Sequence, residues 1–317
     1  MPVLPELAPL LARVKAARAH MPDASVPVAE RRALIHRGMD QRARSVALPP
    51  PPVTRADHQV EVEGGVIAVR SYTPERESPG QPLPGHVYVH GGGWWLGTLD
   101  HRDTLCATLA VAAGCVVVSV EHRLAPEHRF PIPVHDCYAA LAWVAGNAGT
   151  LGIDGTRLSI GGDSSGANLA AATALLARDR GGPSLVAQVL EMPALDLTMG
   201  QPSVNGAEDG VLLTRDDLAA DLAQYCDEDE RTHPYASPLL AQELAGLPDA
   251  LIMTAEFDIL RDDGTAYGER LGRAGVQAEV VCWDGHVHGS HEMTAMLESA
   301  RHWQAQVADF LRERYKV

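Results

Sequence analysis

The stretch Arg157-Leu-Ser-Ile-Gly-Gly-Asp-Ser-Ser-Gly-Ala-Asn-Leu-Ala-Ala171 decides how this chain is interpreted. It begins as an apolar strand, passes through a glycine-rich turn and continues as an alanine- and leucine-rich helix. Gly162, Ser164 and Gly166 fit the pattern Gly-x-Ser-x-Gly, in which a nucleophilic serine stands on a strained strand-to-helix turn. The flanking residues must be small because side chains there would collide across the turn. An inert Gly/Ser turn is the alternative, but the predicted strand and helix around it favour an acyl-transfer nucleophile.

The composition of the chain limits its possible functions. Its 317 residues are 46% hydrophobic, which is enough for a large core in one or two domains. The formal net charge of −15 disfavours nucleic acid as a partner, because a polyanion would be repelled. No apolar run approaches the length of a membrane span, so we expect no transmembrane segment.

Cysteine usage and the first residues both favour a cytoplasmic location. The cysteines are odd in number and widely spaced, and none forms a Cys-x-x-Cys pair or a zinc pattern. Pro2, Pro5 and Glu6 interrupt the region where a signal peptide has its basic and apolar segments, so no export signal is expected. We expect buried, free thiols in a reducing compartment at Cys106, Cys115, Cys137, Cys226 and Cys282.

Residues 1–45 are predicted to form two helices ahead of the main fold. The second is predicted over 28–44, and the proline run 49–52 ends the helical region. Such helices could anchor a chain to a membrane surface, but we favour a cap that packs on the chain's own catalytic domain. In the first helix, apolar residues recur at helical spacing: Leu4, Leu7, Leu11 and Val14.

From residue 46 to 317 the pattern predicts one α/β domain. An antiparallel hairpin comes first, a turn-rich stretch follows over 74–84, and strands then alternate with helices. This alternation predicts an eight-stranded, mostly parallel sheet with helices on both faces. Besides the strand before Ser164, we predict strands over 58–62, 66–72, 86–90, 115–120, 186–191, 251–254 and 278–283. Besides the helix after Ser164, we predict helices over 100–113, with Asp100 as N-cap, 133–147, 262–274 and 292–315.

The segment 196–237 interrupts the alternation of strands and helices. It is rich in turns, is predicted to be helical over 214–225, and contains the acidic run 227–230. An ordered insertion of this length is usually functional, and a lid is its common form. We therefore expect this segment to pack with residues 1–45 as a cap, while the acidic run forms a solvated loop.

A second chemical element follows the third predicted strand at His90-Gly-Gly-Gly93. Attack of a serine on an ester creates an oxyanion that needs fixed N–H donors. A glycine run can turn its amides toward the substrate without side chains in the way. This is the place where α/β-hydrolases form the first half of the oxyanion hole, and the N–H of Ser165 would form the second.

The acid and the base of a triad should follow Ser164 in that order. Asp258 is the acid nearest the end of a predicted strand, with Glu256 as a rival, whereas Asp262 and Asp263 suit the first turn of the next helix. A loop after the last strand contains three histidines, and their spacing cannot choose among them: His286, His288 and His291.

The sequence resembles the hormone-sensitive-lipase-like carboxylesterases of the α/β-hydrolase superfamily, in the bacterial family IV with a Gly-Asp-Ser-x-Gly elbow. The resemblance covers most of the chain beyond the N-terminal helices and rests on His90-Gly-Gly-Gly-Trp94, Arg123-Leu-Ala-Pro-Glu-His128, Gly162-Asp-Ser-Ser-Gly166, Asp258-x-Leu-Arg-Asp262 and His288-Gly289. It implies that Ser164 is the nucleophile, Asp258 the orienting acid and His288 the base, with His286 as a rival base. It also implies an α/β-hydrolase fold with a helical cap, and oxyanion amides from Gly92, Gly93 and Ser165.

Other positions of these motifs are expected around the pocket: His90, Gly91, Trp94, Asp163 and Ser290. Trp95 and Trp94 could line the cleft or belong to the core. The family often has Tyr at position 122, where this chain has His, and Ala at 165, where it has Ser. It commonly has Phe at 290, so the smaller Ser290 is expected to widen or wet the pocket near the base.

These features together predict a serine carboxylesterase for short- to medium-chain acyl esters that uses no metal or organic cofactor. Its partner would be a small-molecule ester, and the family habit makes a homodimer plausible. An amidase or formamidase on the same scaffold is a second possibility, because a triad does not distinguish an ester from an amide. A ligand receptor without catalysis is a third, which the retained serine, acid and histidine argue against.

Overall fold

The computed structural model of the chain describes residues 2–18, 25–75, 80–206 and 212–316. Three predicted regions therefore lie partly outside the described residues. The parts outside are residues 1 and 19–24 of the predicted cap region 1–45, residues 76–79 of the turn-rich stretch 74–84, and residues 207–211 of the segment 196–237.

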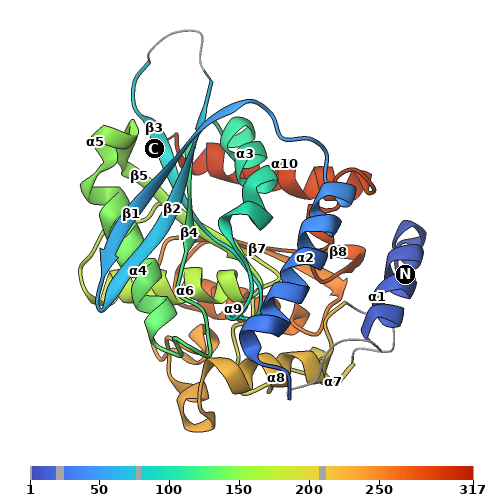
Figure 1. Cartoon of the computed structure of the whole chain (residues 1–317). Helices are drawn as coiled ribbons and strands as arrows, with labels where there is room; N and C mark the ends of the chain where they lie inside the picture. The colour runs from blue at the N-terminus through green and yellow to red at the C-terminus, as the bar shows by residue number, and fades with distance from the viewer. Residues whose placement is uncertain (1, 19–24, 76–79, 207–211, 317) are drawn as a thin grey trace.

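The centre of the fold is one eight-stranded sheet in the order β1-β2-β4-β3-β5-β6-β7-β8 (Figure 1). β1 and β2 form an antiparallel hairpin, β2 pairs antiparallel with β4, and all later neighbours pair in parallel. The predicted number of strands and the mostly parallel sheet are confirmed. The strands are β1 (Val53–Val62), β2 (Gly65–Pro74), β3 (Leu83–Val89), β4 (Val116–Glu121), β5 (Ile153–Asp163), β6 (Ala187–Glu191), β7 (Asp249–Phe257) and β8 (Ala278–Val287).

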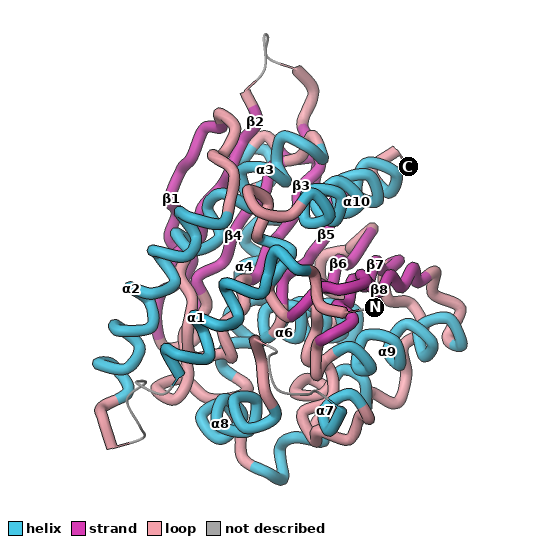
Figure 2. Tube along the Cα trace, turned by 90° about the vertical axis from the view of Figure 1, so that its right-hand side faces the viewer, coloured by secondary structure: helices cyan, strands magenta, loops and turns pink. Residues whose placement is uncertain are grey.

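Helices cover both faces of this sheet, as Figure 2 shows from the side. The α-helices are α1 (Ala8–Arg18), α2 (Val28–Val46), α3 (Asp103–Ala113), α4 (Ile132–Gly146), α5 (Ala148–Leu151), α6 (Ser165–Asp179), α7 (Ser203–Gly206), α8 (Arg215–Tyr225), α9 (Arg261–Arg273) and α10 (Glu298–Arg314). Short 3-10 turns are η1 (Pro5–Leu7), η2 (Leu99–Arg102), η3 (Glu228–Thr232), η4 (Pro238–Leu240) and η5 (Ser290–Glu292).

Strand β4 shows why the sheet is buried on both faces. Val116, Val118 and Val120 pack in the core layer that includes apolar residues of α4, α6 and α9. Val117, on the opposite face, packs in the layer formed with α3 and α10. An unbroken apolar run is therefore required here, because alternate side chains enter different cores.

Two predicted helix starts are wrong, each for a local reason. Asp100 is not the N-cap of α3, because its carboxylate accepts a hydrogen bond from the Arg70 Nη1 at 2.7 Å and the turn η2 precedes the helix. The last helix begins at Glu298 instead of residue 292. Residues before it form η5 and then bind α2, since the N–H of Ala295 donates to the carbonyl of Val46 at 2.9 Å.

The N-terminal helices lie against the loop that follows β8. The N–H of Leu4 donates to the carbonyl of Gly285 at 3.0 Å. Leu7 and Val46 are buried in a third apolar cluster with Val287 and Met293, and Leu212 packs against the same cluster. Residues from both predicted cap regions thus share one apolar cluster beside the end of β8.

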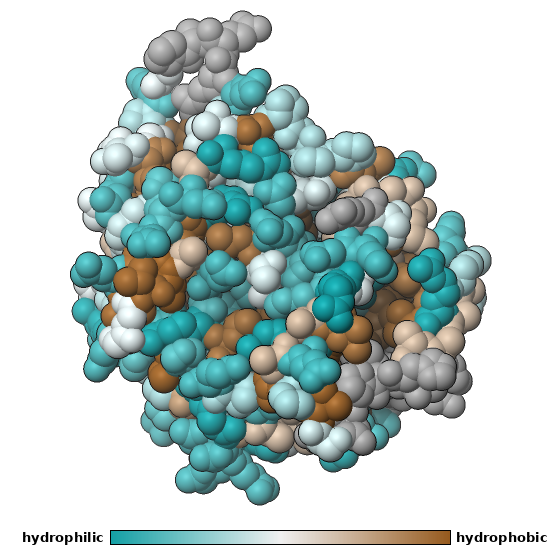
Figure 3. Space-filling model, viewed as in Figure 1, coloured by the Kyte–Doolittle hydropathy of each residue, from teal (hydrophilic) through white to brown (hydrophobic). Residues whose placement is uncertain are grey.

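The face of the molecule in Figure 3 is mainly hydrophilic, with small brown patches distributed among teal residues. No helix in the described part of the chain is long and apolar enough to cross a membrane. The described cysteines are all free, and four of them are buried, but Cys282 is exposed, which corrects the expectation for that residue.

Candidate active site

Ser164 lies between the end of β5 and the start of α6, in a backbone conformation that L-residues rarely adopt. Its φ is 55° and its ψ is −121°, and such strain costs about 1–3 kcal/mol. The N–H of Ser164 donates to the carbonyl of Glu191 at 2.8 Å, which fixes the turn against β6. A Cβ on Gly162 or Gly166 would lie 2.3 or 2.1 Å from the carbonyl oxygen of Val89, so both glycines are required by the close approach of β3.

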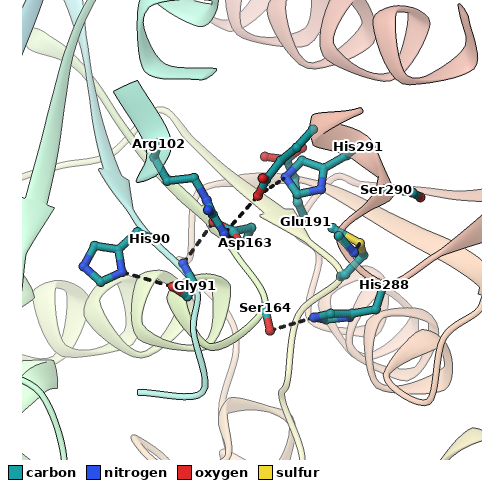
Figure 4. A network of polar contacts seen from close by, with 12 residues as sticks. His90, Gly91, Arg102, Asp163, Ser164, Glu191, His288, Ser290 and His291 are labelled. Atoms are coloured by element: carbon teal, nitrogen blue, oxygen red, sulfur yellow. Dashed lines mark hydrogen bonds and ion pairs between the residues drawn. The ribbon is translucent and has the colours of Figure 1, made fainter. Parts of the chain in front are cut away.

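A hydrogen-bonded chain connects Ser164, His288 and Asp258 (Figure 4 labels the first two). The Oγ of Ser164 lies 3.0 Å from the Nε2 of His288. The Nδ1 of His288 lies 2.7 Å from the Oδ2 of Asp258. Asp258 follows β7 directly and His288 follows β8 directly, so the carboxyl ends of neighbouring parallel strands bring these side chains together.

The environment of His288 makes its imidazole more basic than usual. Burial by itself would lower the pKa of His288, but the carboxylate of Asp258, through its charge and its hydrogen bond, raises that pKa above the ordinary value. Asp258 is itself held in place, because one oxygen of its carboxylate accepts the N–H of Leu260 at 3.0 Å. A neutral His288 with its Nδ1–H directed at Asp258 presents Nε2 as an acceptor for the Ser164 hydroxyl.

The rival histidine lies elsewhere. His286 is buried, with its Nδ1 2.8 Å from the Oγ of Ser290 and its Nε2 2.8 Å from the Oγ of Ser299. Burial, together with the neighbouring His291, lowers the pKa of His286 to about 4. His291 is also buried, and neither of its ring nitrogens has a hydrogen-bond partner among the described residues. The structure thus brings only His288, of the three, to the hydroxyl of Ser164.

The rival acids also have other partners. Glu256 accepts the N–H of Gly285 at 2.7 Å. Asp263 lies in the first turn of α9, as predicted, and its carboxylate accepts the N–H groups of Leu195 and Asp196 at 2.7 and 2.8 Å. Of the predicted candidates, Asp258 is the acid within hydrogen-bond distance of His288.

The expectation that Ser290 opens the pocket is wrong. Ser290 is fully buried, and its hydroxyl donates to the carbonyl of Val287 at 2.7 Å while also contacting His286. Figure 4 shows its side chain pointing away from Ser164. A small polar residue here replaces apolar packing with hydrogen bonds inside the histidine loop, and it does not enlarge the site.

Two further motif residues lie behind the site. His90 is buried and stacks on His122 with ring centroids 4.6 Å apart. Trp94 is buried and stacks on Tyr225, also at 4.6 Å, so it belongs to the core. Trp95 is different, because its indole N–H donates to Asp221, a side chain of α8.

The glycine loop offers free backbone donors near Ser164. Gly92 and Gly93 have φ values of 135° and 60°, which favour glycine. In the hydrogen bonds found among the described residues, the N–H groups of Gly92, Gly93 and Ser165 have no acceptor. Ser165 is the first residue of α6, where the helix dipole also favours negative charge. These three amides are therefore available to a ligand oxygen.

A buried ionic network, drawn in Figure 4, supports this loop from the side of the sheet. Asp163 accepts the N–H of Gly91 at 3.0 Å and the hydroxyl of Tyr88 at 2.8 Å. Arg102 binds the same carboxylate at 2.6 Å and the carboxylate of Glu292 at 2.9 Å. One guanidinium therefore connects the serine turn, the glycine loop and the histidine loop.

The same network contains a cluster that meets the spacing of a metal site. Asp163, His291 and Glu292 each place a potential ligand atom within 4.8 Å of the others. Arg102 already binds both carboxylates, and a divalent cation would have to displace its guanidinium. The donor set thus fits an internal ion-pair network better than a metal centre.

An acid on α8 that no sequence motif marks lies against the glycine loop. The Nε1–H of Trp95 donates to the Oδ1 of Asp221 at 2.7 Å. A Cβ on Gly93 would lie 2.2 Å from the Oδ2 of Asp221. Asp221 lies on the inward side of α8 beside the buried Leu218 and Leu222. This acid on an apolar helix stripe was a signal that could have been found from the sequence.

Comparison with known proteins agrees with this arrangement. A model of the α/β-hydrolase fold family matches residues 86–292. Carboxylesterase NlhH of Mycobacterium tuberculosis is 43% identical over 258 residues, which cover 78% of this chain and 80% of that protein. The arylesterase of Saccharolobus solfataricus is 38% identical over 262 residues, which cover 79% of this chain and 84% of that protein. The solved structure of a hyperthermophilic esterase from the archaeon Pyrobaculum calidifontis has a TM-score of 0.91 at 38% identity and covers 99% of each chain. The chain therefore belongs to the α/β-hydrolase fold family, as a carboxylic ester hydrolase among its hormone-sensitive-lipase-like carboxylesterases.

Proposed function

We propose that the chain hydrolyses short- to medium-chain acyl esters through an acyl-enzyme on Ser164, with His288 as general base and Asp258 as the orienting acid. The observation that carries this proposal is the hydrogen-bonded chain of 3.0 Å from Ser164 to His288 and 2.7 Å from His288 to Asp258. It lies beside three unpaired backbone amides, which is the arrangement that acyl transfer requires.

Each step follows from this geometry. His288 accepts the proton of Ser164 as the Oγ attacks the ester carbonyl, and Asp258 stabilises the resulting imidazolium. The carbonyl oxygen, now negative, accepts hydrogen bonds from the amides of Gly92, Gly93 and Ser165. His288 then protonates the departing alcohol, which leaves the acyl group on Ser164. Water attacks the acyl-enzyme with His288 again as base and releases the carboxylic acid.

Removing the nucleophile or the base tests the proposal. Ser164→Ala and His288→Ala should each lower kcat on p-nitrophenyl acetate by about 10³-fold or more, because they belong to one proton-transfer unit. His286→Ala should cost less than about tenfold, since its ring contacts Ser290 and Ser299 and not Ser164. Turnover would be measured on p-nitrophenyl esters from acetate upward, with circular dichroism as the control for folding. Activity of Ser164→Ala close to wild type would exclude the mechanism.

We also propose that residues 1–45 and the segment 196–237 cover the site as a cap. Arg32 of α2 donates to the carbonyl of Trp95, just after the glycine loop, at 2.8 Å, and α8 of the inserted segment places Asp221 beside that loop. Deletion of residues 1–45 should therefore change the acyl-length profile before it unfolds the sheet. The same p-nitrophenyl ester series measures this, and an unchanged profile in the truncated protein would contradict the cap.

A further inference from the structure

We propose that Asp221 is a specificity-determining residue that selects esters carrying an ammonium group close to the scissile carbonyl. This inference rests on the proposed function, since it names a substrate class for the same site. It starts from the position of the carboxylate. The Oδ2 of Asp221 lies 2.2 Å from the point where a Cβ of Gly93 would be, so the acid directly faces a loop whose amides are free for a ligand oxygen.

The placement of Asp221 is built into the fold. α8 begins with a capping box between Thr214 and Asp217, and its buried residues Leu218 and Leu222 fix which side of the helix faces inward. Asp221 lies on that side, where an apolar residue would pack at lower cost. The indole N–H of Trp95 holds the Oδ1 at 2.7 Å, so the carboxylate has a defined orientation.

No arginine or lysine among the described residues pairs with this acid. Among the described residues, Asp221 has no ion pair, and its Oδ2 accepts no hydrogen bond. Arg31 lies over the ring of Trp95 at 5.5 Å but does not pair with Asp221. A partly buried carboxylate in this state gains most from a ligand that brings a positive charge.

The groups that face Asp221 determine when it is charged. Burial raises the pKa of Asp221 to about 7. The hydrogen bond from Trp95 and the positive charge of a protonated His288 lower this pKa, whereas the negative charge of the neighbouring Asp217 raises it further. The acid is therefore mostly ionised at pH 8 and mostly neutral at pH 6. The net charge of −15 adds a general attraction for cationic substrates, which salt screens, whereas the contact with Asp221 is less sensitive to salt.

Two esters of the same shape separate charge from size. Butyrylcholine and 3,3-dimethylbutyl butyrate differ by a quaternary nitrogen in place of a carbon, and a pH-stat measures the acid released from either. At pH 8 in 0.5 M salt, wild type should show a kcat/KM for butyrylcholine about tenfold above that for the neutral ester. At pH 6 this ratio of the two kcat/KM values should fall toward one. The titration of His288 affects both esters equally and therefore does not change the ratio.

Variants then assign the selectivity to one side chain. Asp221→Asn keeps the shape and the acceptor for Trp95, and it should bring the ratio close to one while the neutral ester reacts up to a few-fold faster. Asp221→Ala should also bring this ratio of kcat/KM values close to one. Asp216→Asn removes an exposed acid from the same helix and should leave the ratio unchanged. A ratio that is near one in wild type, or that survives in Asp221→Asn, overturns this inference. Failure of wild type to hydrolyse either ester overturns the proposed function instead.

Discussion

Two aspartates approach the glycine loop 91–93 from opposite regions of the molecule. Asp163 comes from the sheet, and its Oδ2 lies 2.4 Å from the point where a Cβ of Gly91 would be. Asp221 comes from α8, and its Oδ2 lies 2.2 Å from the corresponding point on Gly93. The loop therefore has a carboxylate close to each end, and a side chain at either position would collide with one of them.

The two carboxylates differ in their partners, and this decides their charge. Burial would raise the pKa of both acids, but Arg102 holds the pKa of Asp163 well below its usual range. Among the described residues, only the indole N–H of Trp95 donates to Asp221, and burial raises the pKa of Asp221 to about 7. The buried Asp163 therefore carries a permanent charge on the sheet side, whereas the partly buried Asp221 is a titratable acid on the helix side.

The largest effect should come from removing the cation on the sheet side. Arg102→Met leaves the buried Asp163 and the partly buried Glu292 with no counter-charge, and we expect the free energy of unfolding to fall by about 3–5 kcal/mol. Arg273→Met is the matched control, because its ion pair with Glu269 is exposed and contributes about 0.3–0.5 kcal/mol. Urea denaturation measures both. Equal stability of the two variants would mean that the network does not hold the sheet side together.

Alanine substitutions in the loop should distinguish its two sides. In Gly91→Ala the new Cβ meets both the carboxylate and the backbone carbonyl of Asp163, so we expect kcat/KM to fall by about 100-fold with no simple rescue. In Gly93→Ala the Cβ meets the carboxylate end of Asp221, which can move, and the positive φ adds about 1–2 kcal/mol of strain. We expect a fall of about tenfold.

A double-mutant cycle checks this difference. Asp221→Ala should restore part of the activity of Gly93→Ala, since it removes the side chain that the Cβ would meet. The readout is kcat/KM on p-nitrophenyl acetate, and strictly additive losses would show that the two residues do not interact.

The smallest effect concerns pH. His288 must be neutral to act as a base, and its pKa lies above the ordinary value, so kcat/KM for a neutral ester should rise as pH increases through a midpoint above about 6.5. Asp221 becomes negative over the same range and stabilises the imidazolium of His288. Asp221→Asn should therefore move the midpoint to lower pH by a few tenths of a unit and raise the plateau. A pH–rate profile of both proteins measures this, and a shift to higher pH would contradict the argument.

Much of the fold could be predicted from the sequence because it depends on local patterns. The apolar run of β4 indicated a strand buried on both faces, and the glycines around Ser164 indicated the turn. Helix starts were predicted less well. Asp100 looks like an N-cap in the sequence, but Arg70 from a distant strand takes its carboxylate.

The site residues were predictable only where the residue type and its place in a motif indicate a chemical role. Three histidines in one loop could not be separated by spacing, because the difference between His286 and His288 is the direction of each ring. Arg102 was missed because its partners Asp163 and Glu292 are far away in sequence. Asp221 was missed because a single acid in a predicted helix resembles a solvated surface residue, and only its spacing from Leu218 and Leu222 distinguishes it.

The strained turn at Ser164 has a consequence for how the chain acquires activity. Its geometry depends on the carbonyls of Val89 and Glu191, and its base lies near the end of the chain at His288. Parallel strands that are distant in sequence must therefore be joined before the serine can react, and such non-local pairing is intrinsically slow. The return of esterase turnover after dilution from denaturant should therefore occur only when the whole sheet has formed. Turnover can thus be used to measure refolding of the enzyme.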